Sequence, residues 1–186
     1  PSVRDQRLRV VTDMFEPASI FKVVTASTAL EAGVVKPDQL FFGENGEYRI
    51  SLPNRKIRVI KDTDPRAWIT FGEAIEYSSN IVMAKVSDII GKERLYHKAR
   101  EFGFGSLTGI NLPGEIRGEL KKPSMWSVTT LNTMAYGYEV GVTPIQLLAA
   151  YGAVANGGVL LKPFLVKEIV SAAGKVLEER DPEVIR

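Results

Sequence analysis

The chain has 186 residues, a formal net charge of +2 and no cysteine, with 45% hydrophobic and 25% charged residues. This length and composition fit a globular protein of one domain, or one domain that lacks a part. The absence of cysteine excludes disulfide bonds, a thiol nucleophile and a cysteine metal site, and the scattered basic residues give no electrostatic case for nucleic acid binding.

The first predicted element is a helix within residues 15–33, "FEPASIFKVVTASTALEAG". Pro17 suits a first helical turn, and Gly33 suits the position just past a helix end. At about 100° per residue the polar side chains scatter around the helix instead of forming one wet stripe, so we expect the helix to be mostly buried. Lys22 then has no carboxylate among its neighbours on this helix.

A lysine in this position has a chemical use. Desolvation favours the neutral amine and lowers its pKa, so Lys22 could take a proton from a hydroxyl one turn away, that of Ser19. A serine becomes a good nucleophile when a positioned base removes its proton. The alternative is that Lys22 extends to solvent and Ser19 caps the helix, which is the more common meaning of an isolated S-x-x-K. The only histidine, His97, lies in a charged helical segment, so a Ser-His-Asp triad is disfavoured.

The elements that follow are predicted from hydrophobic spacing, capping residues and Gly/Pro punctuation. Thr70 with Glu73, and Thr143 with Gln146, have the spacing of capping boxes. In chain order we expect loops with a small hairpin over 34–64, helices over 70–78, 80–91 and 92–103, a loop through 120, a partly helical segment over 124–137, a strong helix over 143–158 and a hairpin over about 163–180.

A second polar segment, Ser78-Ser79-Asn80, lies between two of these helices. Serine and asparagine are preferred N-caps, so the segment needs no function. The functional interpretation is that Ser78 relays a proton between Lys22 and a leaving amine, while the Asn80 amide binds a substrate carbonyl. An S-x-x-K at a helix start, followed about sixty residues later by S-x-N at a helix corner, is a pairing that chance rarely produces.

With these two motifs the chain resembles the transpeptidase domain of penicillin-binding proteins, whose signature joins S-x-x-K with S-D-N-type and K-T-G motifs. The likeness extends from about Arg9 to near Glu179 and includes "EYSSNIVMAKV", "FGFGSLTGINLPGE" and "YGYEVGVTPIQLLAAYGAVANGG". The last segment is more like class B monofunctional members, and its Tyr-Gly-Tyr form, with "FEP" before the serine, favours the cell-division branch over the elongation branch. Ala18 and Ile20 stand where the family has glycine and threonine.

The resemblance implies an α+β fold of the penicillin-binding protein and serine β-lactamase type, mostly its helical part with a late β-hairpin. No lysine in the chain is followed by Ser-Gly or Thr-Gly, so the third motif is missing. In the family this motif lies on a strand downstream of such a hairpin. We therefore expect residues 1–186 to form a single partial transpeptidase domain with an incomplete central antiparallel sheet, lacking the membrane anchor, the pedestal and the K-T-G segment.

By the same resemblance, Ser19 attacks the penultimate D-alanine carbonyl of a peptidoglycan stem peptide that ends in D-Ala-D-Ala, and the acyl group then passes to a neighbouring stem. Lys22 is implied as the base and Ser78 as the group that helps to protonate the leaving amine. Asn80 is implied to hold the substrate or the Lys22 amine. Tyr136, Gly137 and Tyr138 are further implied substrate-binding residues.

β-Lactam antibiotics would acylate the same serine, and no cofactor or metal is implied. The implied partners are a membrane glycosyltransferase and other cell-division proteins, at the outer face of the cytoplasmic membrane in the bacterial envelope. Two alternatives stay open: a β-lactam sensor or β-lactamase of this fold, and a non-catalytic fragment that acts only in binding.

Overall fold

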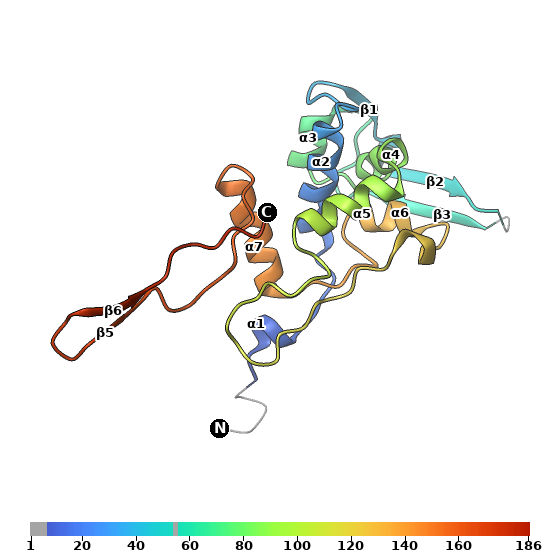
Figure 1. Cartoon of the computed structure of the whole chain (residues 1–186). Helices are drawn as coiled ribbons and strands as arrows, with labels where there is room; N and C mark the ends of the chain where they lie inside the picture. The colour runs from blue at the N-terminus through green and yellow to red at the C-terminus, as the bar shows by residue number, and fades with distance from the viewer. Residues whose placement is uncertain (1–6, 54–55) are drawn as a thin grey trace. The chain divides into compact units, whose positions relative to one another are not determined.

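The computed structural model describes residues 7–53 and 56–186, and contacts divide the chain into two compact units (Figure 1). The larger unit comprises Glu16–Ala99 and Leu120–Gly141. The smaller unit comprises the described chain up to Phe15, together with Arg100–Glu119 and Val142–Arg186. Every candidate site residue belongs to the larger unit, and the fold is α+β with small sheets, as predicted.

The core of the larger unit is helical. Its centre is α4, which packs against α2 and α6 and buries apolar side chains on most of its circumference, because its sequence is apolar nearly all round. The predicted helices are confirmed, although the first begins at Ala18 as a 3-10 turn and Phe15 forms an isolated β-bridge with Val142 instead. The helical elements of this unit are η2 (Ala18–Phe21), α2 (Lys22–Glu31), η3 (Glu44–Gly46), α3 (Phe71–Glu76), α4 (Asn80–Ile90), α5 (Lys92–Glu101, which runs on past the unit boundary), η4 (Pro123–Met125) and α6 (Thr130–Ala135).

Two antiparallel pairs of strands accompany these helices. The predicted hairpin is β2 (Glu47–Ser51) with β3 (Ile57–Lys61), in which Arg49 lies opposite Val59; residues 54 and 55 of the predicted loop lie outside the described residues. The second pair, β1 (Leu40–Phe42) with β4 (Trp68–Thr70), was not predicted. Each of its strands has three residues, too few to show an alternating pattern.

The ends of the helices follow the expected local rules. Thr70 forms a capping box with Glu73 at the start of α3, and the Ser79 side chain caps α4 by accepting from the backbone N–H of Val82 at 3.0 Å. At the end of α2, Gly33 has φ +64°, and the N–H groups of residues 33 and 34 donate to the carbonyls of residues 30 and 29. This is a Schellman motif with its usual glycine.

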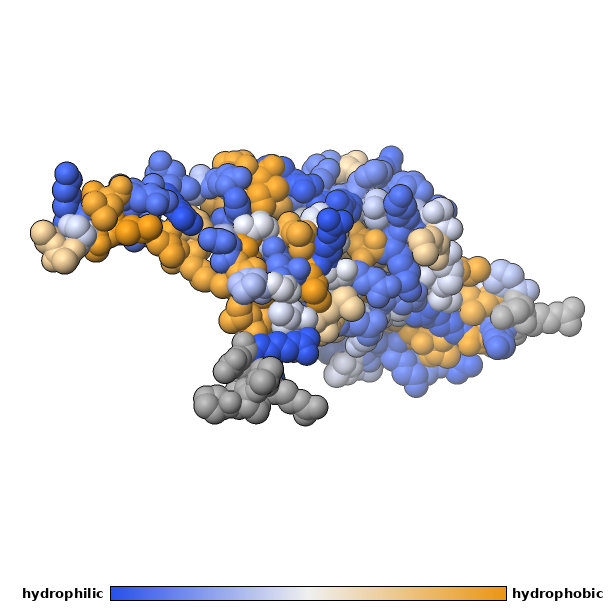
Figure 2. All heavy atoms as spheres, turned by 60° about the horizontal axis from the view of Figure 1, so that its bottom comes forward, coloured by the Kyte–Doolittle hydropathy of each residue, from blue (hydrophilic) through white to orange (hydrophobic). Residues whose placement is uncertain are grey.

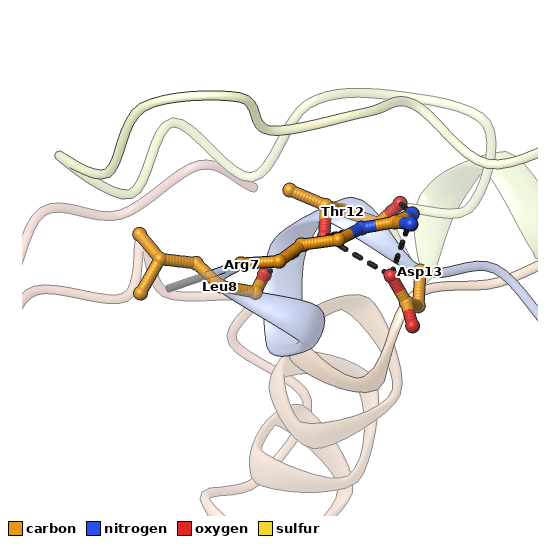
Figure 3. Close-up of polar contacts among 4 residues, drawn as sticks. All are labelled: Arg7, Leu8, Thr12 and Asp13. Carbon is orange, nitrogen blue, oxygen red and sulfur yellow. Dashed lines mark hydrogen bonds and ion pairs between the residues drawn. The ribbon is translucent and has the colours of Figure 1, made fainter. Parts of the chain in front are cut away.

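The smaller unit contains α1 (Arg9–Thr12), α7 (Pro144–Ala155), β5 (Glu168–Val170) and β6 (Val176–Glu179). Val11, Ile110 and Ile145 form a buried apolar cluster. Figure 3 shows Arg7 beside α1, where its guanidinium donates to Thr12 Oγ1 at 3.0 Å and to the Thr12 carbonyl at 3.1 Å and pairs with Asp13 at 2.7 Å. These groups are exposed, so the contacts add little stability.

The predicted capping box of α7 is present, and its Gln146 side chain also donates to the Ser106 and Arg117 carbonyls, at 2.7 and 2.8 Å. The predicted C-terminal hairpin forms as β5 and β6, and both strands are exposed on all residues. Figure 2 shows hydrophobic residues, among hydrophilic ones, along the extended segment on the left that carries β5 and β6. None of the helices in the described ranges is long and apolar enough to cross a bilayer.

Candidate active site

Ser19 lies in η2, the 3-10 turn that leads into α2, and Lys22 is the first residue of α2. Ser19 is exposed, and its side chain makes no capping hydrogen bond and no other hydrogen bond to a described residue. It therefore does not cap the helix, which was the alternative to a functional role. The hydroxyl is available to a ligand that approaches from solvent.

Lys22 is buried, with 3% of its surface exposed, so the alternative in which it extends to solvent is wrong. Its Nζ donates to Ser78 twice, to the carbonyl oxygen at 2.5 Å and to Oγ at 2.9 Å. Desolvation lowers the pKa of Lys22 from 10.5 to about 8, and the negative charge of Asp62 opposes this shift. A neutral amine has two N–H donors and one lone pair. With both donors directed to Ser78, the lone pair is left as a base.

The Ser78-Ser79-Asn80 segment combines two structural motifs. Ser78 has φ +57°, and it ends α3 in a Schellman motif, in which the N–H groups of residues 78 and 79 donate to the carbonyls of residues 75 and 74. Ser79, buried, is the N-cap of α4. The prediction that the segment caps a helix is therefore confirmed for Ser79, whereas Ser78 is the residue that contacts Lys22.

The left-handed conformation of Ser78 is one that glycine adopts without strain, as Gly33 does at the end of α2. A serine here costs about 1 kcal/mol more than the same turn with glycine. What the serine adds is its Oγ, which accepts from Lys22 in a part-buried hydrogen bond of an otherwise exposed residue. Strain held at such a position is typical of a functional residue.

Asp62 was not predicted from the sequence, and it holds this corner in place. Its Oδ1 accepts from the backbone N–H groups of Asn80 at 2.6 Å and Ile81 at 3.1 Å, and its Oδ2 accepts from Ser79 Oγ at 2.5 Å. A carboxylate at the N-terminus of α4 also interacts favourably with the helix dipole. Asp62 follows β3 directly, and no spacing rule connects it with a helix that begins 18 residues later.

Asn80 is half-buried, and its Nδ2 donates to the Lys61 carbonyl at 2.9 Å. Among the described residues the Lys22 amine bonds to Ser78 and not to Asn80. The structure therefore gives Asn80 an anchored side chain two residues from Ser78, and its second N–H and its Oδ1 have no partner within residues 7–53 and 56–186.

The Tyr136-Gly137-Tyr138 segment lies against the turn that carries Ser19. The Ala18 N–H donates to the Gly137 carbonyl at 2.9 Å, and a Cβ atom on Gly137, whose φ is +90°, would lie only 1.9 Å from the Ala18 carbonyl oxygen. Glycine is therefore required here by close backbone approach.

The two tyrosines differ in what they can contact. Tyr136 is buried, and its hydroxyl accepts from Arg58 Nη2 at 3.0 Å, so its side chain is an internal support. Tyr138 is 43% exposed and meets Tyr136 edge-on, with ring centroids 5.9 Å apart. Of the pair, Tyr138 is the one whose ring is open to a ligand.

The site thus joins an exposed serine whose hydroxyl has no partner among the described residues, a buried amine of lowered pKa, and a second exposed serine whose hydroxyl is bonded to that amine. This combination suits nucleophilic attack on a carbonyl with proton transfer through the amine. Two residues that support the site, Arg58 and Asp62, were missed in the sequence because they act through contacts between distant segments.

Comparisons with known proteins agree with this geometry. The sequence model described as penicillin binding protein transpeptidase domain matches residues 2–186. Penicillin-binding protein PbpB of Mycolicibacterium smegmatis is 33% identical over 95% of this chain and 26% of its own length. Stage V sporulation protein D of Bacillus subtilis is 34% identical over 94% of this chain and 26% of its own length.

Solved structures give the same result. Penicillin binding protein 3 of Mycobacterium tuberculosis, in its complex with ampicillin, superposes with a TM-score of 0.81 and 31% identity over 96% of this chain and 38% of that one. A peptidoglycan synthetase of Bifidobacterium adolescentis superposes with a TM-score of 0.82 and 32% identity, over 97% of this chain and 32% of that one. The chain spans about a quarter of the length of the two curated relatives. It belongs to the family of penicillin-binding protein transpeptidase domains.

Proposed function

We propose that this chain carries the nucleophilic site of a serine-type peptidoglycan D,D-transpeptidase, of class B and of the cell-division type. The observation that carries the proposal is the buried Lys22 amine, which bonds to Ser78 and follows the uncommitted Ser19 by one helical turn. Relatives named peptidoglycan D,D-transpeptidase, including FtsI of Escherichia coli at 31% identity, support this reaction class.

In the proposed reaction, Ser19 Oγ attacks the carbonyl carbon of the penultimate D-alanine while the neutral Lys22 amine takes its proton. The C–N bond to the terminal D-alanine then breaks, and the proton passes from Lys22 through Ser78 Oγ to the leaving amine. The product is an ester on Ser19, and the amine of a neighbouring stem peptide attacks that ester to restore the hydroxyl. The proton thus passes only through the Lys22 amine and the Ser78 hydroxyl on its way from Ser19 to the leaving amine.

For the substrate, we propose that Asn80 and the exposed ring of Tyr138 contact the stem peptide. Gly137 and Tyr136 do not contact it and instead support the site, Gly137 against the Ala18 backbone and Tyr136 through its bond to Arg58. A β-lactam carbonyl would react with the same serine.

We also propose a place at the outer face of the cytoplasmic membrane, with a glycosyltransferase and division proteins as partners. One structural neighbour is a peptidoglycan glycosyltransferase of Burkholderia ambifaria, and this likeness supports a link to glycan synthesis.

The test is the intact mass of the chain after incubation with benzylpenicillin, followed by peptide mapping, beside a Ser19→Ala variant of the same thermal stability. A stable adduct on the peptide that contains Ser19, absent from the variant, is the expected result. Rapid loss of the adduct would support a β-lactamase instead. A folded chain that forms no adduct would contradict a working nucleophilic site in these 186 residues and favour a purely binding role.

A further inference from the structure

The turn that carries the nucleophile is fastened to the loop after α6 by two reciprocal contacts, which we call the clamp. The Ala18 N–H donates to the Gly137 carbonyl at 2.9 Å, and the Glu139 N–H donates to Glu16 Oε1 at 2.9 Å. The first bond joins backbone to backbone. The second depends on one side chain, that of Glu16.

Both N–H donors of the clamp belong to residues in a strained conformation. Ala18 has φ +51° and Glu139 has φ +57°, in the left-handed region that side chains other than glycine rarely adopt. Such residues persist when the surrounding contacts hold them, and they gather at functional sites. A loss of either clamp contact removes part of what keeps these two residues in place.

The Glu139 side of the clamp is fixed independently. The Glu139 carboxylate accepts from Thr130 Oγ1 at 2.6 Å, and Thr130 is buried at the start of α6, which packs against α4. Thr130 Oγ1 in turn accepts from the Ser127 N–H at 3.0 Å. The loop is therefore anchored to the helical core, and Glu16 extends from the nucleophile turn to that anchored loop.

We propose that Glu16 is a positioning residue for Ser19, because its carboxylate oxygen ties the nucleophile turn to the loop at residues 137–139. Its role is that of a hydrogen-bond acceptor two residues from the strained Ala18, and not that of a charge. This inference rests on the proposed acyl transfer at Ser19. A nucleophile displaced by about 1 Å can lose about 100-fold in rate, so a small relaxation of the turn has a measurable effect.

The experiment compares Glu16→Ala, which removes the acceptor, with Glu16→Gln, which keeps a carbonyl oxygen but no charge. Glu76→Ala, at the exposed end of α3, is the control for loss of a surface carboxylate. For each protein, stopped-flow measurement with a chromogenic cephalosporin separates the dissociation constant of the first complex from the acylation rate constant. The fraction of protein acylated reports folding.

We expect Glu16→Ala to lower the acylation rate constant at least tenfold, with the dissociation constant within about threefold and the acylated fraction unchanged. We expect Glu16→Gln to remain within about threefold of the original chain. A mere loss of stability would lower the acylated fraction and not the rate constant. An unchanged rate constant in Glu16→Ala, or an equal loss in Glu16→Gln, would overturn the inference.

A second measurement separates this inference from the proposed function. Backbone amide resonances of Ala18, Ser19 and Glu139 are recorded without any substrate. We expect Glu16→Ala to shift all three and to speed hydrogen exchange at the Glu139 amide, with Glu16→Gln close to the original chain. Unchanged resonances in Glu16→Ala would overturn the positioning role even if Ser19 is acylated. An original chain that is never acylated would contradict the proposed function, whatever these resonances show.

Discussion

Replacement of Gly137 by alanine is expected to disable the site while leaving the elements of the larger unit in place. The added Cβ would lie 1.9 Å from the Ala18 carbonyl oxygen, 2.6 Å from its carbon and 2.8 Å from its Cα. Ordinary van der Waals contacts of a Cβ atom begin at 3.4 Å, so the two backbones must separate by more than about 1 Å. This separation would break the hydrogen bond from Ala18 to residue 137 and displace Ser19.

The cost has two parts that can be separated by controls. A methyl group in the left-handed conformation costs about 1–2 kcal/mol, and forced overpacking costs about 1–3 kcal/mol more. Gly33→Ala is the matched control, because Gly33 has φ +64° at the left-handed end of α2 but no atom lies within 4 Å of the position that its Cβ would take. We therefore expect Gly33→Ala to lose about 1–2 kcal/mol of unfolding free energy and no acylation rate.

The assay is the acylation rate constant with a fluorescent penicillin, together with the free energy of unfolding in urea. For Gly137→Ala we expect a loss of about 2–5 kcal/mol in stability and about 100-fold in rate. Acylation of Gly137→Ala at the original rate would refute the need for glycine at this close approach. A loss of rate in Gly33→Ala as large as that in Gly137→Ala would refute it as well.

The remaining predictions concern the amine and the corner that holds it. Because the pKa of Lys22 is lowered to about 8, its neutral fraction rises from about one tenth at pH 7 to about nine tenths at pH 9, and we expect the acylation rate to rise about tenfold over that range. Lys22→Ala should lose about 10²–10⁴-fold and show no such rise in a stopped-flow pH series. Asp62→Asn should lower the free energy of unfolding in urea by about 1.5–3 kcal/mol. It should also move the pH profile of the acylation rate to lower pH, because the Asp62 charge raises the Lys22 pKa. Its control is Asp64→Asn, which removes an exposed ion pair and should cost less than about 1 kcal/mol. Ser78→Gly and Ala18→Gly both relieve a left-handed residue, so calorimetry should find neither less stable by more than about 1 kcal/mol, whereas acylation should fall at least tenfold only in Ser78→Gly. An equal loss of rate in both would contradict the proton transfer assigned to Ser78.

Local rules in the sequence predicted most helices because their signals lie within a few residues. The capping boxes at Thr70 and Thr143 and the glycine after α2 form as expected. The pair β1 and β4 was missed because three-residue strands carry no periodic signal, and η3 and the β2–β3 hairpin separate them in the sequence. Pro17, predicted for the first helical turn, is the N-cap residue one position before that turn, whereas the bridge of Phe15 with Val142 joins residues far apart in the sequence and was not predicted.

For the candidate site, as for the fold, the sequence predicted the local features and missed the contacts between distant segments. Burial of Lys22 followed from the scattered polar residues of its helix, and its neighbour Ser78 followed from the S-x-N motif. Asp62 and Glu16 act through hydrogen bonds that join segments 18 and 123 residues apart, which no spacing rule reveals. The sequence therefore indicates the candidate catalytic groups, and the fold is needed to see which residues hold them.

The most direct test of the account is the titration of the Lys22 amine. With lysine labelled by ¹⁵N and the Lys22 signal assigned by its absence from Lys22→Arg, the amine shift is followed by NMR from pH 6 to pH 11. We expect a midpoint near 8, because burial disfavours the charged form and the amine can then act as a base toward Ser19. A midpoint near 10.5, the ordinary value of lysine, would contradict the base role on which the proposed acyl transfer depends.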